Sequence, residues 1–124
     1  MSVYLADWES SGIEGMIGDF ERVYDWQKDR KEKIAELIKS EKYAGIEVLF
    51  AYYSYEDYSG KAFVLFRRDG KLYEVNGSHC SCYGLEDQWE PEETTVESIR
   101  FRMGKETWTF RGFETELSNV LGGL

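Results

Sequence analysis

Cysteine, basic residues and long apolar runs are all scarce in this sequence, and each shortage excludes a class of protein. Only two of the 124 residues are Cys, and a single residue separates them, so there is no disulfide framework and we expect a reducing cytosol. No stretch approaches the ~18 to 20 apolar residues that a membrane span requires, and the first residues do not resemble a signal peptide. We therefore expect a soluble, unprocessed, cytoplasmic protein.

Basic residues are outnumbered by acidic ones. The chain has 15 Lys and Arg against 24 Asp and Glu, which gives a net charge of -9 and a pI near 4.7. Binding to duplex DNA or RNA depends on Lys and Arg that neutralise phosphates, so this composition disfavours direct nucleic-acid binding. An acidic chain of this length fits a single domain (1–124) whose partner is a basic protein.

The first part of the chain, residues 1–45, has helical periodicity. Apolar residues recur at helical spacing from Ile13 to Tyr24, although three glycines weaken that pattern. A stronger pattern runs from Gln27 to Lys42, and Ala44-Gly45 is its expected end. Four acids interleave six bases in the second pattern. It therefore predicts a solvated helix face rather than a basic contact patch.

The middle of the chain, residues 46–83, predicts a three-stranded antiparallel meander. β-branched and aromatic residues crowd residues 46–55. Two further strands, at 62–67 and 72–76, flank Asp69-Gly70, which is typical of a two-residue type I′ turn. This turn sets a register in which one face of the hairpin is apolar and is the expected core face. The facing pairs are Phe66 with Tyr73 and Val64 with Val75.

The last part, residues 94–121, predicts two helices. Thr94 and Glu97 have the spacing of a capping box just after Pro91, the only proline, so a helix is expected from about Thr95 to a stop at Gly104. The apolar stripe of a last helix consists of Phe110, Phe113, Leu117, Val120 and Leu121. The expected fold is α+β: a three-stranded antiparallel β-meander packed against N-terminal and C-terminal helices.

The segment between the hairpin and these helices holds the only His and both Cys. His79, Cys80 and Cys82 are zinc-type ligands, but no second Cys/His pair exists and the spacing is wrong for a structural zinc site. A thiol nucleophile activated by His79 is equally disfavoured, because adjacent residues rarely reach the required geometry. We therefore expect no catalysis, no bound metal and no cofactor.

The same segment is densely acidic and aromatic, which favours a binding surface. Acidic side chains steer a basic partner, and Trp89 would be the aromatic anchor. The structural alternative is that the two Cys are small buried residues and that Trp89 fills the core. The predicted acidic contacts are Glu86, Asp87, Glu90, Glu92 and Glu93. A second candidate patch consists of Asp7, Glu9, Glu14, Asp19, Glu21 and Asp25.

A cluster of tyrosines marks the first predicted strand and its following loop. Such aromatic density could stack a small nucleotide in a closed pocket, whereas packing on the two faces of a sheet explains it equally well. The cluster consists of Tyr52, Tyr53, Tyr55 and Tyr58, with Phe50 beside them.

The stretch from about Tyr53 to Met103, and above all its run HCSCYGLEDQWEPEETT (79–95), resembles a family of small uncharacterised proteins carried by tailed bacteriophages and prophages. The likeness covers about two-fifths of the chain. It implies a viral protein of the host bacterial cytosol, and such proteins are often host-takeover or anti-defence factors, including inhibitors of CRISPR effector complexes.

These observations together predict an anti-CRISPR-like, non-enzymatic accessory protein. Its acidic surface would mimic phosphate and inhibit a nucleic-acid-handling defence complex of the host. Two alternatives stay open. One is a small zinc- or thiol-dependent protein that uses His79, Cys80 and Cys82, and the other is an anti-defence protein that sequesters a nucleotide in the tyrosine cluster.

Overall fold

A five-stranded sheet with two helices on each side forms the protein. The structure, a computed structural model, describes residues 2–24, 26–56, 59–80, 85, 88–105 and 110–124. The elements follow in the order β1 (Val3–Ala6), α1 (Gly12–Glu21), α2 (Arg30–Lys39), β2 (Glu47–Glu56), β3 (Ser59–Arg68), β4 (Lys71–Cys80), β5 (Glu92–Thr94), α3 (Val96–Met103) and α4 (Glu114–Gly122).

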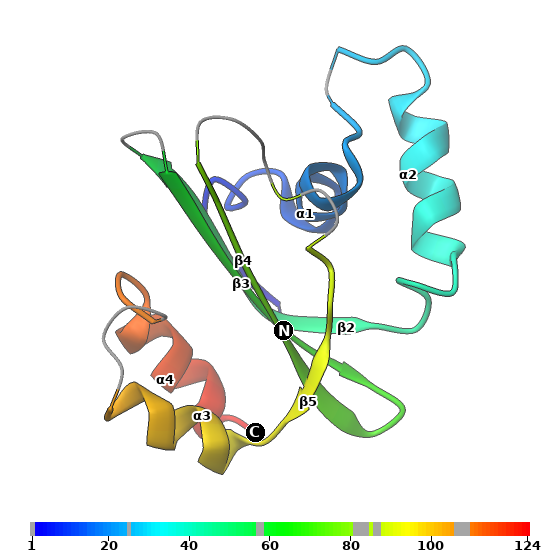
Figure 1. The fold of residues 1–124 in the computed structure, drawn as a ribbon. Helices are drawn as coiled ribbons and strands as arrows, with labels where there is room; N and C mark the ends of the chain where they lie inside the picture. The colour runs from blue at the N-terminus through cyan, green and yellow to red at the C-terminus, as the bar shows by residue number, and fades with distance from the viewer. Residues whose placement is uncertain (1, 25, 57–58, 81–84, 86–87, 106–109) are drawn as a thin grey trace.

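The three layers place the two halves of the chain on opposite faces of the sheet. Helices α1 and α2 lie on one face, and α3 and α4 lie on the other (Figure 1). The α1 side is filled by Trp8, Met16, Ile17, Phe20 and the inward residues of the strands. The α4 side is filled by Phe50, Phe63, Leu65, Ile99, Phe110, Phe113 and Leu117.

The predicted α+β class is confirmed, but the three-stranded meander is incomplete. The strand order is β1-β2-β3-β4-β5, with β1 parallel to β2 and all other pairs antiparallel. The sequence pattern missed β1 and β5 because they have four and three residues, too few for an alternation of apolar and polar side chains to be recognised.

The predicted hairpin register is confirmed. Phe66 pairs with Tyr73 and Val64 with Val75, and the turn residues Asp69 and Gly70 have φ values of 54° and 76°. The prediction of a single core face was wrong, because α3 and α4 cover the opposite face as well. Phe63 and Leu65, which alternate with Val64 and Phe66 along β3 and so point to that opposite face, are fully buried there.

Helix α3 begins one residue later than the capping pattern predicted. The cap is Thr95, whose hydroxyl accepts a hydrogen bond from the Ser98 N–H at 3.0 Å. Thr94 instead lies in β5, opposite Leu72 of β4. The strand pairing of Thr94 competes with its capping role, so the second of two consecutive threonines takes the cap. The stop at Gly104 is confirmed.

Candidate partner-binding surface

Two neutral residues, Leu85 and Gln88, fix the acidic segment (86–93) to the sheet. The carboxamide of Gln88 accepts a hydrogen bond from the Ser78 N–H at 2.8 Å and donates one to the Ser78 carbonyl at 2.7 Å. Leu85 is buried in the core on the α1 side. A Cβ atom at Gly77 would lie only 3.1 Å from Leu85, so the absence of a side chain there permits this close approach.

Trp89 is a core residue, and its predicted role as a surface anchor is wrong. Its side chain is only 6% exposed. The indole stacks on Phe66 with ring centroids 5.5 Å apart and planes 12° apart, and it contacts Tyr43 and Phe20 at 4.8 and 5.1 Å. Because the ring is buried among other aromatic rings, a partner protein cannot contact it. The structural alternative for Trp89, that it fills the core, is therefore the correct one.

The acids that follow Trp89 point to solvent. Four of them are exposed: Glu90 just before β5, Glu92 and Glu93 on β5, and Glu97 in the first turn of α3. Only Glu93 forms an ion pair within the described residues, with Lys71 at 3.9 Å, and both partners are more than half exposed, so solvent screens that pair. The other two predicted contacts, Glu86 and Asp87, lie outside the described residues.

The acidic surface, which we define as Glu90, Glu92, Glu93 and Glu97, lies in a part of the chain without basic residues. The sequence from 72 to 99 contains seven acids and no Lys or Arg. β5 is also an outer strand of the sheet. The negative potential of this edge is therefore not cancelled by cations of the same segment, although a short, charged edge strand also discourages edge-to-edge aggregation.

One acid of this part of the chain is buried and holds α3 against the sheet. Glu74 of β4 is 5% exposed, and both guanidinium nitrogens of Arg102 on α3 donate to its carboxylate, one of them at 2.8 Å. Burial opposes ionisation, but hydrogen bonds from Arg102, Thr94 and Asn76 outweigh it and lower the pKa of Glu74 below its ordinary value of 4.5. The outer face of α3 is thereby fixed next to β5.

An exposed aromatic residue lies beside the acids, and sequence reasoning missed it. Phe101 is 67% exposed on α3, one turn after Glu97 and on the same side of the helix. The Lys105 ammonium lies 5.4 Å from its ring centroid. The signal in the sequence was the position of Phe101 two residues after the inward-facing Ile99, which places it on the outer half of the helix.

The second predicted patch, at the N-terminus, is largely engaged within the fold. Asp19 accepts a hydrogen bond from the Trp8 indole N–H at 2.7 Å, and Glu14 lies 3.7 Å from Arg30. Asp25 lies outside the described residues, whereas Asp7 and Glu9 are exposed. Acids that satisfy internal donors contribute less to an external field, so this group is not a second continuous acidic surface.

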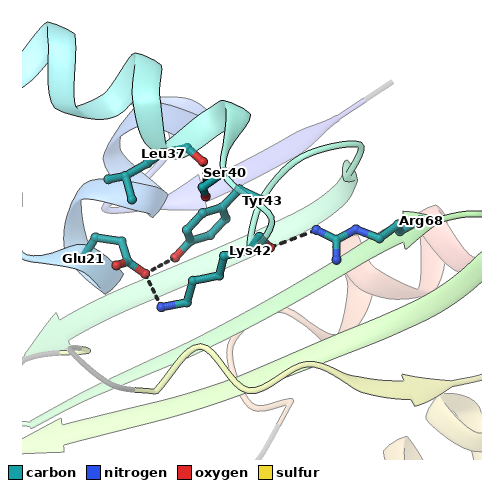
Figure 2. A network of polar contacts seen from close by, with 6 residues as sticks. All are labelled: Glu21, Leu37, Ser40, Lys42, Tyr43 and Arg68. Atoms are coloured by element: carbon teal, nitrogen blue, oxygen red, sulfur yellow. Dashed lines mark hydrogen bonds and ion pairs between the residues drawn. The ribbon is translucent and has the colours of Figure 1, made fainter.

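Glu21, another acid of that group, connects α1 to the segment after α2. Its carboxylate accepts hydrogen bonds from the Tyr43 hydroxyl at 2.6 Å and the Lys42 ammonium at 2.5 Å (Figure 2). The Arg68 guanidinium donates to the Lys42 carbonyl at 2.9 Å and extends the network to β3. Burial and the Glu21 carboxylate together raise the pKa of Tyr43, so the phenol stays a donor.

The cysteine segment lies only partly within the described residues. β4 continues to Cys80, and the backbones of His79 and Cys80 pair with Gly60 and Ser59. Cys82 lies outside the described residues, as do the side chains of the other two predicted ligands. No group of three metal-binding side chains occurs among the residues that were described, so the zinc and thiol alternatives remain predictions.

The tyrosine cluster is divided between the two faces of β2. Tyr52 packs on Phe113 with ring centroids 4.5 Å apart, on the α4 side. Tyr53 packs on Trp8 at 5.1 Å, on the α1 side. These two rings therefore cannot line one nucleotide pocket, and sheet-face packing accounts for them. Tyr58 and the side chain of Tyr55 lie outside the described residues.

Comparison with known proteins found no match. No protein-family model, curated protein or solved structure matches the chain. Within the described residues, no helix has the length and apolar character needed to cross a membrane.

Proposed function

We propose that the protein binds a basic partner protein through the acidic surface on β5 and α3, with Phe101 as its aromatic anchor. The observation that carries this proposal is the group of exposed acids, of which only Glu93 lies within ion-pair distance of a cation among the described residues. Hydrogen bonds of Gln88 with Ser78 and of Arg102 with Glu74 hold this part of the chain against the sheet. Rigid placement reduces the entropy that a charged surface loses on binding.

The partner class follows from the chemistry of the surface. Carboxylates at fixed spacing can form ion pairs with Lys and Arg side chains that otherwise bind phosphate. The electrostatic field of the carboxylates also accelerates the encounter with a positively charged patch. The resemblance to small phage proteins supports one such partner: a nucleic-acid-handling defence complex of the bacterial host. Binding would then inhibit by competition with nucleic acid, without chemistry at the protein itself.

Charge reversal at the acidic surface tests this proposal. Glu90→Lys, Glu92→Lys and Glu97→Lys are combined in one tagged variant, which is used to capture partners from a bacterial lysate that contains defence systems. The matched control reverses three exposed acids elsewhere: Glu9, Glu32 and Glu41. Both variants have a net charge of -3 instead of -9, so they differ only in where the charge was changed.

The expected result is that a basic, nucleic-acid-binding protein is captured by the wild type and the control variant and is lost from the acidic-surface variant. Thermal unfolding should show that both variants are folded. Equal loss of capture in both variants would contradict the proposal, because the attraction would then depend on net charge rather than on this surface.

A further inference from the structure

A groove on the α4 side of the sheet combines an apolar floor with charges of both signs. Its volume is about 570 Å³, within the range of sites for small organic molecules. The floor consists of Val3 on β1, Leu49 on β2 and Val120 on α4. Arg67 and Glu116 lie on its rim, on β3 and α4 respectively. The acidic surface does not contribute to this groove.

The floor is made by a β-bulge. Val48 pairs with Phe66 and Phe50 pairs with Leu65, so Leu49 is an extra residue without a cross-strand partner. Leu49 is only 5% exposed, yet it belongs to neither hydrophobic core. The bulge therefore places a buried apolar side chain under the groove, and bulges of this kind are frequent beside binding sites.

The rim supplies one cation and two carboxylates. Arg67 lies 3.5 Å from Glu47, and both side chains are about half exposed, so this ion pair is weak and a ligand carboxylate can compete for the guanidinium. Glu116 forms no ion pair within the described residues.

We infer that this groove binds a small zwitterion with an apolar body, either an amino acid or a short peptide. The ligand carboxylate would pair with Arg67, its ammonium with Glu116, and its apolar side chain would cover Leu49 and Val120. Such a ligand would pair with the guanidinium and the carboxylate of the groove and cover its apolar floor at the same time. A simple anion or a simple cation would leave one of the two charged groups without a partner in the ligand.

The test compares four probes that share one branched alkyl group. L-leucine carries both charges, the dipeptide Leu-Leu carries them farther apart, 4-methylpentanoate lacks the ammonium, and 3-methylbutylamine lacks the carboxylate. Binding is followed by calorimetry and by the NMR shifts of the Val3, Leu49 and Val120 methyl groups. We expect one of the two zwitterions to bind at least about tenfold more tightly than both single-charge probes, since a charged hydrogen bond accounts for such a factor.

Matched variants locate the site. Arg67→Gln and Glu116→Gln should each weaken the zwitterion about tenfold or more, whereas Glu32→Gln, an exposed change on α2, should leave binding unchanged. The preferred zwitterion decides between an amino-acid and a peptide site. Equal binding of either single-charge probe, or methyl groups that none of the probes shifts, would overturn the inference. Reversal of Glu90, Glu92 and Glu97 should leave zwitterion binding intact, so this result is independent of the partner surface.

Discussion

Trp89 and Phe101 flank the acidic surface in the sequence, and they have opposite surroundings. Trp89 is packed among three rings of the core, whereas Phe101 is exposed on α3. Trp89→Ala should lower the free energy of unfolding by about 3–5 kcal/mol, as expected for a large core cavity. Phe101→Ala should change it by less than about 0.5 kcal/mol and should weaken partner binding by about tenfold.

Chemical denaturation and partner affinity, measured on both variants, check this assignment. A strongly destabilised Phe101→Ala protein would show that the ring is structural. Unchanged partner affinity in that variant would show that Phe101 is not an anchor.

Trp8 and Trp89, the buried tryptophans among the described residues, differ in their indole N–H groups. Trp8 donates to Asp19, whereas the Trp89 nitrogen is buried without a hydrogen-bond partner among the described residues. Trp8→Phe should therefore lower the free energy of unfolding by about 1–3 kcal/mol more than Trp89→Phe does, because it removes the hydrogen-bond donor of the Asp19 carboxylate. Urea unfolding of the two variants measures the difference. Equal costs would mean that ring volume, and not the hydrogen bond, dominates at Trp8.

Glu74 should make stability depend on pH in the acidic range. Its pKa is lowered in the folded state, so the unfolded state binds the proton more readily and folding is favoured when the group is ionised. This contribution is complete above the ordinary pKa of 4.5 and is lost as the pH falls through the lowered value. Glu74→Gln should lower the free energy of unfolding at pH 7 by about 2–4 kcal/mol. The difference in this free energy between the variant and the wild type should become smaller below pH 4.5.

Unfolding curves at several pH values test this prediction, with Glu92→Gln as the control. Glu92 is the residue opposite Glu74 in the strand pairing, but it is exposed. A gap that stays constant from pH 7 to the acidic range would contradict the role of ionised Glu74.

At the scale of elements, the sequence predicted the structures that depend on neighbouring residues, such as turns, and missed those that depend on long-range pairing. The Asp69-Gly70 turn fixed the hairpin register correctly, because both residues must adopt positive φ. Strands β1 and β5 could not be predicted in this way. Each is short and is stabilised by the neighbouring strand, so its formation depends on long-range pairing rather than on its own sequence.

The same turn gives a test of backbone conformation. Gly70 has φ of 76° and open space around its Cα, so Gly70→Ala should destabilise the protein by about 1 kcal/mol through backbone strain alone. Gly122, at the end of α4, also has open space but no positive φ. Gly122→Ala should therefore be neutral or slightly stabilising. Thermal unfolding distinguishes the two, and equal shifts would contradict the explanation.

At the scale of the whole molecule, the sequence predicted where acidic residues are concentrated better than it predicted which side chains are buried. The excess of acid and the block around residues 86–97 were visible in the sequence, and the structure shows that four of those acids are exposed. Burial could not be read from the same pattern. Trp89 and the N-terminal acids Asp19 and Glu21 were expected at the surface, but tertiary contacts use them inside the fold.

The most direct test of the proposed interaction is the salt dependence of affinity for the purified partner complex. Attraction between the acidic surface and a basic partner is screened within about 8–10 Å near physiological ionic strength, so affinity should fall steeply as salt is raised. We expect the Glu90→Lys, Glu92→Lys, Glu97→Lys variant to have lost this salt dependence along with most of its affinity, while the control variant keeps both. Wild-type affinity that does not change with salt would contradict it.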